Sequence, residues 1–88
     1  MNTWKQILAD SGKRVTRPRQ AIIDALRCCD KPQSPEQVLE TARKSYPNLG
    51  LATVYRTLDL FAEIGVVRLV QYDGTIRYAP ATLGHRHP

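Results

Sequence analysis

The side chains with the clearest chemistry in this 88-residue sequence are cations that gather near its beginning. Four of them fall within seven residues that contain no acid: Lys13, Arg14, Arg17 and Arg19. Guanidinium groups bind phosphate through paired hydrogen bonds, and ammonium groups bind it as point charges. The whole chain has 13 Lys and Arg against 8 Asp and Glu, a formal net charge of +5. This excess favours a polyanionic partner, while a solvated surface remains the alternative for the local cluster.

Two histidines and two cysteines are the candidate metal ligands and nucleophiles. His85 and His87 alternate, so an extended chain presents both imidazoles to one ion, but two ligands do not close a site. Cys28 and Cys29 are adjacent and lack the C-x-x-C spacing of a metal clasp. We expect both to be small buried residues at the end of a helix, with a redox or metal role as the alternative. No Ser/His/Asp set, carboxylate pair or glycine-rich phosphate loop appears, so catalysis is not expected.

These side chains must be positioned by helices, and apolar spacing predicts four of them. The first covers 3–11 and stops at Ser11-Gly12. The second begins after Thr16, because a hydroxyl residue before Arg17-Pro18 can cap the first turn, and residues 30–32 end it. Its apolar stripe consists of Ile22, Ile23, Leu26 and Cys29.

The third and fourth helices have stronger boundary signals. Ser34-Pro35-Glu36-Gln37 combines a capping serine, a proline in the first turn and a glutamine that completes a capping box. We expect this helix to close at Tyr46-Pro47 with Val38, Leu39 and Ala42 buried. The fourth helix covers 51–64 and ends at Gly65. Val54, Leu58 and Phe61 share its buried face, and the opposite face carries Ala52, Tyr55, Arg56 and Asp59.

The pattern then changes to that of a β-hairpin. Val66–Tyr72 and Thr75–Tyr78 are predicted strands around a tight turn at Asp73-Gly74. The fold class is therefore α+β, mainly α: a winged helix-turn-helix of three to four helices followed by a two-stranded hairpin, the wing. We assign residues 1–80 to this domain and 81–88 to a tail.

In such a fold the fourth helix is the recognition helix, which enters the major groove of double-stranded DNA. Its first turns carry Ala52, Thr53, Tyr55 and Arg56. Arginine suits guanine or phosphate, tyrosine offers flat contact to a thymine methyl group, and a small alanine allows close approach. Two plainer alternatives stay open: Tyr55 partly buried against the apolar face, and Arg56 paired with Asp59 on the surface.

Two motifs make a resemblance specific. Leu51-Ala52-Thr53-Val54-Tyr55-Arg56-Thr57-Leu58, followed by Phe61 and Gly65-Val66-Val67, resembles the recognition-helix signature of the ferric-uptake-regulator family. Arg14-Val15-Thr16-Arg17-Pro18-Arg19 resembles the stretch that leads into that family's second helix. The match runs over nearly the whole chain, with the motifs in the expected order.

The resemblance implies a role in transcription. Family members are dimeric repressors that bind AT-rich palindromes when loaded with a divalent metal such as iron, zinc or manganese. In them the residues matching Tyr55 and Arg56 contact DNA, and a basic residue matching Arg14 reaches the minor groove. The candidate DNA-binding residues are therefore Arg14, Thr16, Arg17, Arg19, Ala52, Thr53, Tyr55 and Arg56. A winged helix that binds protein through the same surface is the alternative function.

The resemblance also implies parts that this sequence lacks. Family members continue into a dimerisation domain, and His85 and His87 resemble the H-x-H at the hinge before it. Some members carry a histidine before the third helix and a glutamate after the second wing strand, where this chain has Lys31-Pro32-Gln33 and Tyr78-Ala79-Pro80. We therefore expect no cofactor in this chain, and a divalent metal and a homodimer only for the full-length protein. No small-molecule substrate, membrane segment or signal peptide is expected, and the expected location is cytoplasmic.

Overall fold

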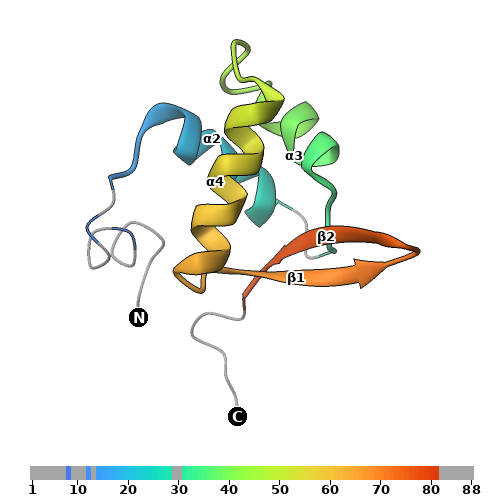
Figure 1. Ribbon diagram of the computed structural model, residues 1–88. Coiled ribbons are helices and arrows are strands. Elements are labelled where there is room, and N and C mark those ends of the chain that lie inside the picture. Colours follow the sequence, from blue (N-terminus) through green and yellow to red (C-terminus); the bar gives the residue numbers. More distant parts are fainter. Residues whose placement is uncertain (1–7, 9–11, 13, 29–30, 82–88) are drawn as a thin grey trace.

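Three helices followed by an antiparallel hairpin make up the part of the chain that the computed structural model describes, residues 8, 12, 14–28 and 31–81 (Figure 1). The elements are α2 (Arg17–Arg27), α3 (Pro35–Ala42), α4 (Leu51–Glu63), β1 (Val67–Tyr72) and β2 (Thr75–Pro80). This order confirms the predicted winged helix-turn-helix. The predicted first helix and the tail lie mostly outside the described residues, although Leu8 is described and fully buried in the core.

Helix α2 begins as predicted. The hydroxyl of Thr16 accepts a hydrogen bond from the backbone N–H of Arg19 at 3.3 Å. The helix ends at Arg27, earlier than predicted, so that Cys28 is its C-cap. The expectation that Cys28 is buried is wrong: the residue is exposed because it lies past the buried face that ends at Leu26, and its thiol donates to the carbonyl of Ala25 at 3.2 Å. Cys29 lies outside the described residues.

Helix α3 has the predicted capping box. The backbone N–H of Ser34 donates to the side-chain oxygen of Gln37 at 2.9 Å, and the N–H of Gln37 donates back to the serine hydroxyl at 3.2 Å. The helix ends at Ala42 instead of near Tyr46. Its last carbonyls are taken up by tighter turns, in which Lys44 N–H donates to Thr41 and Ser45 N–H to Ala42.

The core is made by one face of each helix. Val54, Leu58 and Phe61 of α4 are fully buried, as predicted, and Thr57 joins them at 5% exposure. Leu60 is half-buried and packs against the edge of this core. Gly65 follows α4 with φ at 86°, a left-handed conformation that glycine adopts without the steric cost of a side chain.

The hairpin has the predicted two-residue turn. Asp73 and Gly74 have φ values of 54° and 80°, as the most common tight hairpin turn requires. Strand β2 runs to Pro80, two residues beyond the prediction, because Ala79 and Pro80 pair with Arg68 and Val67 of β1. Tyr78 also pairs with a residue outside the hairpin. That residue is Gln33, whose backbone exchanges two hydrogen bonds with Tyr78 as a short third strand.

Candidate nucleic-acid interface

The exposed face of α4 is a stripe that we call the α4 stripe: Ala52, Tyr55, Arg56 and Asp59. All four residues are exposed, which confirms the predicted division of the helix into a buried and an open face. Tyr55 is 42% exposed, so it borders the hairpin without being buried in the core. Thr53, the remaining candidate on this helix, is half-buried.

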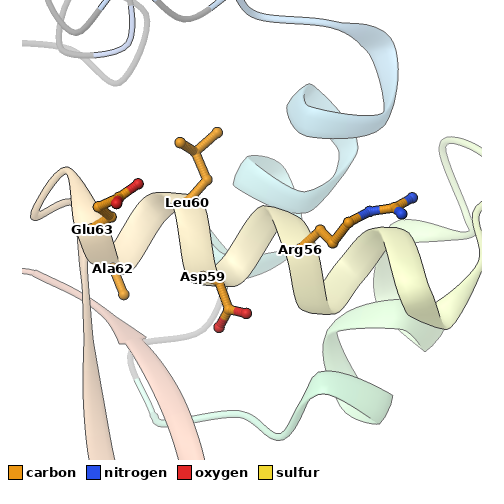
Figure 2. A pocket seen from close by; sticks show the side chains of 5 residues that line it. All are labelled: Arg56, Asp59, Leu60, Ala62 and Glu63. Atoms are coloured by element: carbon orange, nitrogen blue, oxygen red, sulfur yellow. The ribbon is translucent and has the colours of Figure 1, made fainter.

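Arg56 and Asp59 do not neutralise each other. Figure 2 shows the guanidinium of Arg56 directed toward the beginning of α4, and the carboxylate of Asp59 directed to one side of the helix. The two groups point apart, and no ion pair joins them in the part of the chain that the structure describes. The surface pairing considered from the sequence is therefore not formed, and the Arg56 side chain extends into the solvent.

Two sets of contacts hold α4 in its orientation: those of its buried face and those of the turn that precedes it. Its buried face packs on both α2 and α3. The turn between α3 and α4 is tied by Arg43, whose Nε donates to the carbonyl of Leu49 at 2.8 Å. Gly50 caps the helix without a side chain, and its carbonyl accepts from Val54 N–H at 3.2 Å.

The basic residues of segment 14–19, just before α2 and in its first turn, fall into two groups. Some are exposed, and others support the backbone. Arg14, Thr16 and Arg17 are exposed, whereas Arg19 is half-buried. One guanidinium nitrogen of Arg19 donates to the carbonyl of Arg14 at 2.8 Å, and the Thr16 hydroxyl serves as the helix cap. Arg19 and Thr16 therefore hold the backbone that displays Arg14 and Arg17. Lys13 lies outside the described residues.

Helix α4 lies at the front of the molecule with two regions beside it. In Figure 1 the beginning of α2 (blue) lies to one side of α4, and the hairpin (orange to red) extends from its C-terminal end. Exposed cations on these two regions include Arg14 just before α2, Arg17 at the start of α2, and Arg68 on β1. Both regions that flank α4 in this view therefore carry exposed positive charge.

Tyr78 links this surface to the hairpin. It lies on β2 with 7% exposure, and burial raises the pKa of its phenol above the usual 10.0. The negative charge of Asp59 raises that pKa further, and Tyr55 contributes in the same direction. Ionisation of Tyr78 on the hairpin is therefore opposed mainly by burial and also by the charge of Asp59 on α4. Sequence reasoning missed Tyr78, Gln33 and Arg43 as positioning residues, because each acts through a partner distant in sequence or on a loop carbonyl.

Metal ligands are not assembled in the described part of the chain. Among residues 8, 12, 14–28 and 31–81 there is no group of three or more His, Cys, Asp or Glu side chains able to hold an ion. The position before α3 is occupied by Gln33, whose amide nitrogen donates to Ala25 at 3.1 Å. His85 and His87 lie outside the described residues. None of the helices described is long and apolar enough to cross a membrane.

Comparisons with known proteins all point to one group. The sequence profile described as "Ferric uptake regulator family" matches residues 10–88. The peroxide-responsive repressor PerR of Staphylococcus saprophyticus is 31% identical over 81 residues, which cover 91% of this chain and 55% of that protein. The chain thus spans little more than half the length of this curated relative.

Solved structures agree with the sequence matches. A zinc-bound manganese uptake regulator superposes with a TM-score of 0.84 at 25% identity, over 96% of this chain and 64% of the other. The ferric uptake regulator from Pseudomonas aeruginosa with manganese gives a TM-score of 0.75 at 33% identity, over 88% of this chain and 59% of the other. Both likenesses extend over the helices and the hairpin.

Proposed function

The chain belongs to the ferric uptake regulator family, and on that premise we propose that it is the DNA-binding part of a metal-responsive transcriptional repressor. In this proposal residues 1–80 form the winged-helix domain, and 81–88 are the hinge to a dimerisation domain. The whole protein recognises an AT-rich palindromic operator as a homodimer. It has no catalytic activity and acts in the cytoplasm.

The observation that carries the proposal is the exposed α4 stripe, on a helix whose opposite face packs on α2 and α3. A helix enters the major groove, which is about 12 Å wide, when one face is free and the other is anchored. Here the free face presents Tyr55 and Arg56 in the first two turns. In the proposal Arg56 donates to guanine or phosphate, Tyr55 packs on a thymine methyl group, and Ala52 and Thr53 lie against the backbone.

The segment before α2 supplies the second contact. Arg14 precedes α2 and Arg17 is its first residue; both are exposed, and Arg19 and Thr16 hold this backbone. Narrow minor grooves of AT-rich DNA concentrate negative potential, which attracts such arginines. We assign Arg14 to the minor groove and Arg17 to the neighbouring phosphates.

Metal dependence is assigned to the whole protein. The relatives include regulators whose structures are described as zinc-bound or with manganese. The described residues of this chain do not fit such an ion, since no three ligands meet and Gln33 is engaged with Ala25. Iron, zinc or manganese would therefore act through ligands outside the described residues. By itself the chain is expected to be a monomer that binds DNA weakly and without regard to metal.

The test uses a duplex enriched by this chain from a randomised library, titrated by fluorescence anisotropy. Arg56→Ala should weaken binding by about 1–3 kcal/mol and relax the preference at one base pair. Arg27→Ala is the matched control, because it removes the same charge from an exposed residue at the far end of α2 and should have little effect. A parent chain without salt-dependent binding to any duplex would instead favour the protein-interaction alternative.

A further inference from the structure

One residue of the α4 stripe has the wrong charge for a surface that binds a polyanion. Asp59 is exposed and lies on the same face as Tyr55 and Arg56, about one turn further along the helix. A carboxylate near phosphates lowers affinity for every DNA sequence, by repulsion that salt screens. This general loss of affinity can be offset at particular DNA sequences if the carboxylate forms a specific contact with a base there.

The carboxylate of Asp59 is not engaged elsewhere in the described structure. It forms no ion pair with Arg56, whose guanidinium points toward the beginning of the helix (Figure 2). By comparison, Asp24 on α2 accepts a hydrogen bond from the side chain of Gln20 at 2.9 Å. The charge of Asp59 contributes to the raised pKa of Tyr78, after burial, so the carboxylate lies within electrostatic reach of β2.

With α4 in the major groove, as proposed, Asp59 would lie over a different base pair from Ala52. From Ala52 to Asp59 the helix rises roughly 10 Å, which is about three base-pair steps of DNA. In the major groove cytosine presents an amino donor, whereas guanine and thymine present acceptor oxygens that repel a carboxylate. Adenine offers a donor beside an acceptor nitrogen. A lone carboxylate at the base edges of the major groove therefore matches cytosine best.

We propose that Asp59 is a specificity residue whose carboxylate accepts a hydrogen bond from the amino group of a cytosine in the major groove. The same charge repels phosphates when α4 meets other sequences, so Asp59 lowers non-specific binding. This inference rests on the proposed function and adds one C·G pair to the site, near the end of the segment read by α4.

The test compares Asp59→Asn with Asp24→Asn. Both make the same substitution at an exposed aspartate, but Asp24 lies on α2, outside the α4 stripe, and an asparagine there can still accept the hydrogen bond from Gln20. Parent and variant chains are used in parallel to select duplexes from a randomised library, and anisotropy titrations follow on the parent's best duplex, its single-base variants and a scrambled duplex at two salt concentrations.

Asp59→Asn should bind the scrambled duplex about two- to threefold more tightly at low salt, with a smaller gain at high salt. Its preference for one C·G pair should fall about tenfold, and the enriched sequences should lose that cytosine. Asp24→Asn should change neither quantity. Thermal unfolding of each variant checks that the exposed substitutions leave the fold intact.

Two results would overturn the inference. First, Asp59→Asn could keep the parent's base preferences and its ratio of specific to scrambled binding. Asp59 would then have no part in base recognition. Second, an equal gain for Asp24→Asn would reduce the effect to net charge. In either case Arg56→Ala still reports on the proposed function, so that proposal can survive while this one fails. Absence of duplex binding by the parent chain would overturn both.

Discussion

Gln33 should respond to substitution according to the direction of its hydrogen bond. Its side-chain nitrogen donates to the carbonyl of Ala25 at 3.1 Å, and the residue is 7% exposed. Gln33→Met keeps the volume and loses the donor, which should lower the free energy of unfolding by about 1 kcal/mol. Gln33→Glu at pH 7.5 places a carboxylate oxygen against a carbonyl oxygen at a buried position, and should cost about 3 kcal/mol.

The cost of Gln33→Glu should depend on pH with a definite sign. Burial and the facing carbonyl raise the folded-state pKa of the introduced carboxyl above the unfolded value of about 4.3. Near pH 4 the neutral acid can donate to Ala25, so stability relative to the parent is retained there. That stability is lost as the pH rises through the folded-state pKa. The difference between variant and parent should therefore grow between pH 4 and pH 7.5.

Urea unfolding followed by circular dichroism at the two pH values measures these quantities. Gln37→Glu is the matched control, because the side-chain oxygen of Gln37 accepts from Ser34 N–H at 2.9 Å and from Arg77 at 3.4 Å. A carboxylate can accept both hydrogen bonds, so this variant should be as stable as the parent or slightly more stable. Equal losses for the two glutamate variants at pH 7.5 would refute the assignment of donor and acceptor at Gln33.

Three further predictions concern single residues. Ser34→Ala should lower the free energy of unfolding by about 1 kcal/mol in urea titrations, because it removes one half of the capping box at α3; no change would mean that Pro35 alone starts the helix. Gly65→Ala should lower the free energy of unfolding by about 1 kcal/mol, because φ at this position is 86°. No atom lies within 4 Å of the added carbon, so the cost comes from the backbone alone. Gly50→Ala should cost less, because Gly50 has a negative φ and equally open space around it. Tyr78 should ionise above pH 10 in ultraviolet titration, so stability is full below pH 10 and falls as the pH rises toward its folded-state pKa. Tyr78→Phe should remove that alkaline loss, and an unchanged pH profile would contradict the raised pKa of Tyr78.

Local signals predicted the helices and the turn well because each depends on neighbours in sequence. The Thr16 cap, the Ser34 capping box and the Asp73-Gly74 turn all act over three residues or fewer. The spacing of Val54 and Phe61 likewise sets the exposed face of α4, since a helix repeats every 3.6 residues. The fold class followed from these elements in order.

The errors in prediction lie where distant contacts decide. Cys28 was expected to be buried, but α2 stops one residue before it and the thiol is exposed. Strand β2 is longer than expected because Ala79 and Pro80 pair with Arg68 and Val67 of β1, and no local pattern announces the bridge between Gln33 and Tyr78. Arg43 carries an ordinary surface charge in sequence, and its bond to Leu49 depends on how the turn closes. The roles assigned to the α4 stripe and to Arg14 remain predictions that need DNA to test.

The pairing of Gln33 with Tyr78 also determines the order in which the molecule assembles. It closes a loop of roughly 45 residues that contains α3, α4 and β1, whereas the helices and the two-residue hairpin form from near neighbours. Closing a long loop costs chain entropy that short-range elements avoid, so the Gln33–Tyr78 bridge should form late in folding. In the native state it is then an early place to open. The amides of Gln33 and Tyr78 should exchange with deuterium ahead of those in the middle of α4, in a partial opening that releases the wing and leaves the recognition helix on its core.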